Sequence, residues 1–74
     1  MTVKQYLGRQ IRLARKRKGL SQEELGRIVG LSNQAVCRWE RGRNEPCSEH
    51  IVALCKALDV SSDHLLGLDK ADSE

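Results

Sequence analysis

The stretch from Ser21 to Gly42, SQEELGRIVGLSNQAVCRWERG, constrains the fold of this chain more than any other. Ser21 is followed three residues later by Glu24, the spacing of a capping box, in which each side chain covers an exposed backbone N–H of the other residue. Gly30 stands where a left-handed residue is needed to end a helix, and Ser32 is placed to cap a second one. The sequence therefore predicts two short helices joined by a tight turn.

Each of these two helices has one apolar face. Leu25 and Val29 lie four residues apart on the first, while Val36 and Trp39 point inward from the second. Helices joined by so short a turn cross at close range, and Gly26 supplies the small residue that this contact needs. The pattern resembles a helix-turn-helix, whose second helix sits in the major groove of DNA. An ordinary αα-hairpin inside another small bundle is the alternative interpretation.

The outward face of the second helix is polar and suited to reading bases. Asn33 and Gln34 lie at its N-terminal end, which points into the groove, and an amide side chain can bind adenine N6 and N7 together. Arg38 lies one turn beyond Gln34 on the same face and can bind guanine O6 and N7. Cys37 joins these predicted base contacts because it can reach a thymine methyl group; the alternative is that it contacts nothing.

A second set of polar residues is predicted to contact the DNA backbone. Some lie at helix N-termini, where backbone N–H groups favour a phosphate, although both serines are caps whether or not DNA is bound. Lys18 ends the basic run Arg15–Lys18, in which some side chains are expected to face phosphates. The remaining residues follow the second helix of the motif. The predicted backbone contacts are Ser21, Gln22, Ser32, Lys18, Arg41, Arg43 and Asn44.

Length and charge bound the remaining possibilities. The 74 residues are expected to form one domain over residues 1–68, with its motif at about 21–41, and a polar tail over residues 69–74. Residues 1–46 carry a formal charge of +7 and residues 47–74 carry −4, so the basic field is one-sided and suits a polyanion. No membrane-spanning run or signal peptide is seen, so we expect a cytoplasmic protein without a membrane partner.

The three cysteines, Cys37, Cys47 and Cys55, show no C-x-x-C spacing, which favours reduced thiols. Cys55 falls on an apolar stripe and is interpreted as a small core residue. Cys47 with His50 could form a metal or thiol-sensing site, but two ligands do not close a tetrahedral zinc site. We therefore expect no metal and no cofactor.

Apolar spacing predicts the helices outside the motif. A helix is expected over residues 3–18, with one stripe formed by Val3, Leu7, Ile11 and Ala14. Another is expected over residues 48–58, after which Asp59 stands where a left-handed residue is needed. A last short helix is expected between Ser61, as its cap, and Gly67, which ends it.

Several motifs occur in an order typical of one family. They are Ile11-Arg12, Arg15, Lys18-Gly19-Leu20-Ser21-Gln22-Glu23-Glu24-Leu25, Gly30-Leu31-Ser32, Trp39-Glu40-Arg41-Gly42, Pro46 and Leu54-Cys55-Lys56-Ala57-Leu58-Asp59-Val60-Ser61. Through them, residues from about 9 to 67 resemble the lambda-repressor-like, Cro/repressor (Xre-type) helix-turn-helix family of transcriptional regulators.

The resemblance implies a fold and a set of residue roles. The implied fold is all-α, a compact five-helix lambda-repressor-like DNA-binding domain with a central helix-turn-helix, usually a homodimer on a two-fold operator. Arg15 and Glu40 match a family pair that forms a buried or half-buried salt bridge between the first helix and the recognition helix. Positions matching backbone or base contacts in the family are Gln22, Ser32, Asn33, Gln34 and Arg38.

The sequence departs from the family pattern at positions away from the DNA face. Ala14 stands where Leu is common, and Gly26 where Ala is commoner, so the helices are expected to lie closer or the core to be less filled. Cys47 replaces the usual serine cap, which leaves Ser48 as an alternative cap, and Asp59 replaces a common Gly. These departures bear on stability rather than on DNA binding.

The predicted function is that of a sequence-specific regulator that binds double-stranded DNA, as a repressor or operon controller, with no small-molecule site. The alternative is an antitoxin-type module that binds a partner protein and regulates itself through DNA. We expect no enzyme, because the sequence shows no nucleophile–base arrangement, phosphate-cradling glycine loop or carboxylate pair. Val60, Leu65 and Leu68 are candidates for a dimer surface because they are apolar and late in the chain.

Overall fold

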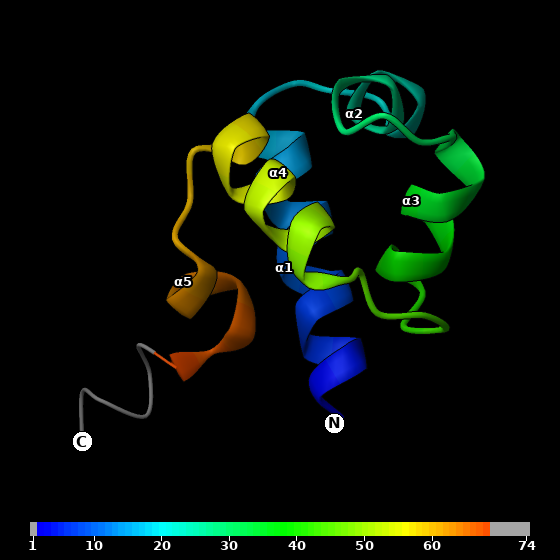
Figure 1. Cartoon of the computed structure of the whole chain (residues 1–74). Helices are drawn as coiled ribbons and strands as arrows, with labels where there is room; N and C mark the ends of the chain where they lie inside the picture. Colours follow the sequence, from blue (N-terminus) through cyan, green and yellow to red (C-terminus); the bar gives the residue numbers. More distant parts are fainter. Residues whose placement is uncertain (1, 69–74) are drawn as a thin grey trace.

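The computed structural model describes residues 2–68, which form five α-helices and no β-strand. The helices are α1 (Val3–Arg17), α2 (Gln22–Ile28), α3 (Asn33–Glu40), α4 (Ser48–Leu58) and α5 (Ser62–Leu66). In Figure 1, α1 and α4 lie in the middle, α2 and α3 to one side, and α5 to the other. The predicted all-α fold is confirmed; the expected tail over residues 69–74 lies outside the described residues.

Four helices begin with a hydroxyl side chain that accepts a backbone N–H three residues further on, which satisfies one of the donors that a helix start leaves unpaired. These caps are Thr2 to Gln5, Ser21 to Glu24, Ser32 to Ala35 and Ser61 to His64. The predicted capping box is confirmed, because Glu24 Oε1 accepts the Ser21 N–H at 2.8 Å. The backbone N–H and hydroxyl of Ser21 hold the pKa of Glu24 below its ordinary value of 4.5.

The start of α4 differs from the other four. Cys47 is the N-cap residue, with extended backbone at φ −72° and ψ 172°, and its side chain makes no cap hydrogen bond. The prediction that Ser48 serves as an alternative cap is wrong. Ser48 is already the first helical residue, and an N-cap residue must have non-helical backbone for its side chain to turn back onto the helix.

The core is a single cluster drawn from all five helices. Its buried side chains are Leu7, Ile11, Ala14, Leu25, Val36, Trp39, Leu54, Leu58 and Leu65. The prediction that Val3 shares the inner stripe of α1 is wrong, because this first helical residue is 61% exposed and only the next turn, at Leu7, reaches the cluster. Leu65 is fully buried, so it cannot belong to a surface between two copies of the chain.

Glycines allow α3 to approach its neighbours closely. A Cβ on Gly26 would lie 2.7 Å from the carbonyl oxygen of Ser32, so the predicted close contact in the motif is confirmed. A Cβ on Gly8 of α1 would overlap the carbonyl oxygen of Trp39. Left-handed backbone occurs where the sequence predicts it after α4, at Asp59, where φ is 57°.

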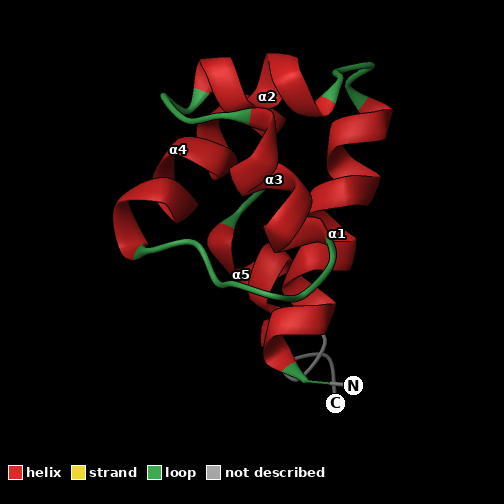
Figure 2. Cartoon of the chain, turned by 90° about the vertical axis from the view of Figure 1, so that its right-hand side faces the viewer, coloured by secondary structure: helices red, strands yellow, loops and turns green. Residues whose placement is uncertain are grey.

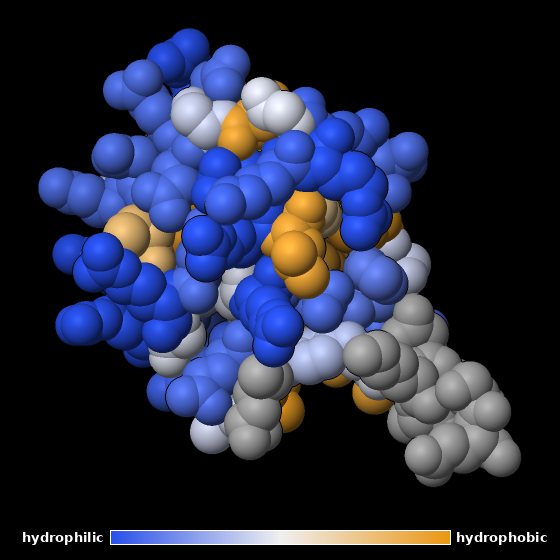
Figure 3. Space-filling model, turned by 180° about the vertical axis from the view of Figure 1, so that it is seen from behind, coloured by the Kyte–Doolittle hydropathy of each residue, from blue (hydrophilic) through white to orange (hydrophobic). Residues whose placement is uncertain are grey.

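The surface is mostly hydrophilic. Figure 3 shows the face opposite the view of Figure 1, where apolar groups appear only as small separate patches among polar side chains. The large apolar side chains that remain exposed come from α1, α2, α4 and the residue after Gly67, namely Val3, Leu13, Ile28, Val52 and Leu68. No helix in the described part of the chain has the length and apolarity needed to cross a membrane.

Candidate nucleic-acid interface

The helix α3 presents its inner and outer sides to different surroundings. Val36 and Trp39 are buried on its inner side, while Asn33, Gln34 and Arg38 are exposed on its outer side. Figure 2 faces this side of the molecule, where α3 crosses the surface below α2. The capped start of α3 therefore projects its amide side chains outward, in the arrangement that a recognition helix needs.

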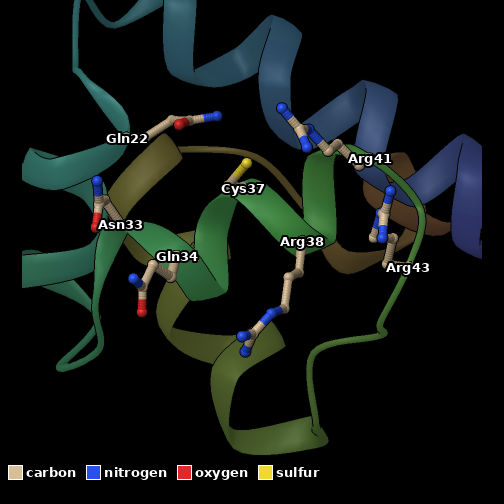
Figure 4. A pocket seen from close by; sticks show the side chains of 7 residues that line it. All are labelled: Gln22, Asn33, Gln34, Cys37, Arg38, Arg41 and Arg43. Atoms are coloured by element: carbon tan, nitrogen blue, oxygen red, sulfur yellow. The ribbon is translucent and has the colours of Figure 1, made fainter.

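A shallow groove of about 370 Å³ runs along the outer face of α3. It is lined by Gln22, Asn33, Gln34, Cys37, Arg38, Arg41 and Arg43. Figure 4 shows Asn33 and Gln34 near the start of α3, Arg41 and Arg43 beyond its end, and Gln22 reaching in from α2. The structure thus brings together all four predicted base contacts and three of the seven predicted backbone contacts.

The other predicted backbone contacts lie outside this groove. Ser21 and Ser32 are exposed caps, and Asn44 is exposed in the loop after α3. Lys18 points elsewhere, because its Nζ lies 4.0 Å from the carboxylate of Asp59 in an exposed ion pair. Its predicted phosphate contact is therefore not brought to the groove by the structure.

Arg15 of α1 and Glu40 of α3 form a two-pronged ion pair behind the groove. Arg15 Nε donates to Glu40 Oε2 at 2.6 Å and Nη2 donates to Oε1 at 3.1 Å. Arg15 Nη1 also donates to the carbonyl of Leu20 at 2.8 Å. The Arg15 and Glu40 side chains are only 11% and 4% exposed, so the pair joins α1 to α3 away from solvent.

Gln22 is tied to the same pair. Its Nε2 donates to Glu40 Oε1 at 3.1 Å, so the amide is held at the edge of the groove before any ligand arrives. A side chain that is already ordered loses less conformational entropy when it binds. Gln22 thereby combines the position predicted for a backbone contact with a structural role that the sequence did not indicate.

A second groove, of similar size, lies beside the first. It is lined by Arg12, Arg15, Lys16, Gln22, Glu40 and Arg41, and shares Gln22 and Arg41 with the first groove. Since Arg15 is neutralised by Glu40, the groove keeps the charges of Arg12, Lys16 and Arg41. Arg12 was not among the predicted contacts, although the sequence places Arg12 and Lys16 four residues apart, on either side of Arg15.

Metal ligands do not gather at this interface or elsewhere in the described part of the chain. No group of three or more His, Cys, Asp or Glu side chains is placed there to hold a metal ion. What the interface offers instead is amide, guanidinium and ammonium groups, which donate hydrogen bonds to base edges and phosphates.

These features define a class of protein, a five-helix domain with a central helix-turn-helix whose second helix presents polar side chains outward and is followed by cationic ones. Residues 11–65 match the model of the helix-turn-helix family HTH_3, and the chain belongs to this family. The lambda-repressor-like, Xre-type resemblance stated from the sequence is confirmed.

Relatives with known names extend the comparison. The chain is 47% identical over 62 residues to repressor protein C2 of Salmonella phage P22, covering 84% of this chain and 29% of that protein. It is 36% identical over 64 residues to the antitoxin PezA of Streptococcus pneumoniae, covering 86% of this chain and 40% of the antitoxin. The chain therefore spans less than half the length of either protein.

A solved structure of the phage repressor supports the fold directly. The crystal structure of the P22 c2 repressor in complex with a synthetic operator superposes with a TM-score of 0.80 at 47% identity. The match covers 84% of this chain and 94% of the solved chain.

Proposed function

We propose that this chain is a sequence-specific, double-stranded DNA-binding transcriptional regulator that inserts α3 into the major groove. The observation that carries the proposal is the groove on the outer face of α3, which gathers Asn33, Gln34 and Arg38 and continues into the cationic side chains beyond the end of the helix. The phage relative that was solved with a synthetic operator supports the same function. The proposed activity is binding, not catalysis.

The groove suits direct base reading. Asn33 and Gln34 each carry a donor and an acceptor that match adenine N6 and N7, and Arg38 carries two donors that match guanine O6 and N7. Cys37 is half-buried between them and offers an apolar surface to a thymine methyl group. We propose that these four residues set the sequence preference.

Phosphate contacts then fix the orientation. We propose that Arg41 and Arg43 bind the backbone beyond one end of α3, and that Arg12 and Lys16 bind it from the second groove. Ser21, Gln22, Ser32 and Asn44 supply further contacts at helix starts and in the loop, whereas Lys18, which points towards Asp59, is left out of the proposed interface.

We further propose that two copies bind a two-fold operator and that the chain acts as a repressor or operon controller. Helix-turn-helix domains generally bind as dimers to half-sites about one helical turn of DNA apart, so symmetry in the protein is matched by symmetry in the site. A DNA-binding regulator must share a compartment with its operator, and we propose that this compartment is the cytoplasm.

The similarity to PezA favours a second candidate function. An antitoxin-type module would bind a partner protein and use the same groove to regulate its own operon. This candidate predicts that affinity for DNA is secondary to affinity for the partner.

The experiment that tests the proposal is selection from a randomised duplex pool with the purified protein at two salt concentrations. Enrichment of a palindrome, with affinity that falls steeply as salt rises, is the expected result. Salt-sensitive binding without an enriched sequence would contradict it and leave the partner-protein function ahead.

The phosphate assignment has its own test on the enriched site. Replacing Arg12 and Lys16 together by Gln is expected to reduce the slope of log affinity against log salt by about 2, and to weaken specific and random DNA alike. The charge-matched control replaces Arg17 and Arg27, which are exposed and line neither groove. Equal slopes for both double variants would contradict the assignment.

A further inference from the structure

The side chains of Cys47 and His50 meet at the start of α4. Cys47 Sγ lies 3.3 Å from His50 Nδ1, and Cys47 is exposed. From the sequence, these two residues are named as a candidate metal or thiol-sensing pair three positions apart, and the structure brings their side chains into contact. In the tautomer that carries its ring proton on Nε2, Nδ1 of His50 is free to accept the thiol proton of Cys47.

A third side chain orients the base. The rings of His50 and Trp39 have centroids 5.7 Å apart and planes tilted by 45°. Trp39 is only 4% exposed and belongs to the core, so packing against it restricts rotation of the half-buried imidazole. A nucleophile, a base within hydrogen-bond reach and a group that orients the base together characterise an activated nucleophile.

The two other thiols lack this combination. Cys55 is half-buried against the core, and burial raises the pKa of its thiol, which disfavours the reactive thiolate. Cys37 is half-buried in the groove on α3. Among these three thiols, all in the described part of the chain, Cys47 alone is both exposed and hydrogen-bonded to a base.

We propose that Cys47 and His50 form a reactive thiol site that exchanges with small disulfides such as glutathione disulfide. The thiol proton passes to Nδ1 of His50 as Sγ attacks one sulfur of the disulfide. A new S–S bond forms at Cys47 and the old S–S bond breaks. The departing thiolate takes the proton from the imidazolium, so Cys47 is oxidised, the released thiol is reduced, and no further oxidant is required.

The site is connected to the DNA-binding face, and this part of the inference rests on the proposed function. A mixed disulfide pulls Sγ away from Nδ1 and frees an imidazole that packs behind α3. Cys47 also lies four residues after Arg43, which lines the groove. Glutathione is anionic, so its attachment close to Arg43 and Asn44, both proposed phosphate contacts, opposes DNA binding by like-charge repulsion.

The thiol site is tested first without DNA. The reduced protein is treated with glutathione disulfide at neutral pH in the presence of a metal chelator, and fragment mass spectra follow the adduct on each cysteine. The same reaction in denaturant supplies the rate of each unstructured thiol. Cys47 is expected to react first, and faster in the folded than in the denatured protein.

The variant H50Q removes the base while keeping a polar side chain of similar size. It is expected to slow the reaction at Cys47 roughly tenfold and to leave the rate at Cys37 unchanged. The matched control is H64Q, because His64 is also the third residue of its helix. Equal reactivity of Cys37 and Cys47, or an unchanged Cys47 rate in H50Q, would overturn the proposal.

The connection to DNA is measured separately. Wild type carrying glutathione on Cys47 is expected to lose affinity for the enriched operator and to regain it after reduction, while treated C47S keeps its affinity. An adduct on Cys47 that leaves operator affinity unchanged would overturn the connection and leave the thiol site standing. Absence of any operator binding by the reduced protein would instead refute the proposed function.

Discussion

The end of α3 is held in two different ways on its two sides. Towards α1, Glu40 is closed into an ion pair with Arg15 whose polar atoms have partners and little contact with solvent. Towards α4, Trp39 packs against His50, and Nδ1 of the His50 ring lies within hydrogen-bond distance of the sulfur of the exposed Cys47. The side towards α1 is shielded from solvent by its buried ion pair, whereas the side towards α4 leaves the sulfur of Cys47 accessible to small molecules.

The start of α4 is best understood beside the start of α5. Both have a small polar residue followed three positions later by histidine: Cys47 with His50, and Ser61 with His64. Ser61 Oγ accepts the backbone N–H of His64 at 3.0 Å and caps its helix. Cys47 instead turns its sulfur to the ring of His50 and leaves the start of α4 uncapped. One atom, sulfur in place of oxygen, thus exchanges a cap for a reactive pair.

Removing the buried ion pair between Arg15 and Glu40 is expected to have the largest effect on stability. Glu40→Ala leaves the Arg15 guanidinium buried without a counter-charge, so we expect it to cost about 3–5 kcal/mol in the free energy of unfolding, measured with denaturant. Glu23→Ala is the control, since its ion pair with Arg27 is exposed and worth below about 1 kcal/mol. A double-mutant cycle of Arg15 and Glu40 with a coupling energy near zero would remove the basis of the comparison.

A change on the outer face is expected to leave both sides of α3 intact. Arg38→Ala should reduce operator affinity by about 1–3 kcal/mol, with relaxed preference at one base pair, because only a base contact is lost. Stability should stay within about 0.5 kcal/mol, since the side chain is exposed. Binding of operator and random DNA to the wild type and the variant checks this; equal loss on both would show that Arg38 contacts only phosphate.

Changing the N-cap residues Cys47 and Ser61 tests the contrast between the starts of α4 and α5. Cys47→Ser is expected to stabilise the fold by about 1 kcal/mol, because its hydroxyl can accept the backbone N–H that the thiol leaves uncapped. Ser61→Ala should cost a similar amount, because it removes a cap that is present. Thermal unfolding of both variants measures this, and a Cys47→Ser protein no more stable than wild type would show that sulfur is not the reason for the missing cap.

The smallest expected effect concerns pH at the start of α2. The pKa of Glu24 is lowered by its bonds to Ser21, so its charged form contributes stability above the ordinary value of 4.5, and this is lost as pH falls through the lowered pKa. Glu24→Gln should therefore differ more from wild type at pH 7 than at pH 3. Denaturant unfolding at the two pH values tests this, and a difference independent of pH would show that charge has no part in the cap.

The sequence predicted most of the local structure because the signals are local. The Ser21–Glu24 box and the left-handed Asp59 each depend on a few neighbouring residues. The capping box of Thr2 with Gln5 is equally local, although the sequence-based prediction did not include it.

What the sequence could not predict depends on contacts between distant segments. Gly8 has no local pattern that distinguishes it from an ordinary glycine, yet it meets the backbone of Trp39. The second groove requires α1 to lie beside the end of α3, so Arg12 gains a candidate role only once the fold is known. The exposure of Val3 likewise follows from which helices reach it, whereas the burial of Leu65 agrees with its predicted place in the core.

The two close glycine contacts have a consequence for how such a protein changes over evolutionary time. Gly26 meets the backbone of Ser32 at one end of α3, and Gly8 meets the backbone of Trp39 at the other. The recognition helix is therefore docked at both ends through main-chain atoms, which every amino acid shares. Its outward side chains can be exchanged without altering its pose, so a duplicated copy can acquire a new operator by substitutions on one face alone.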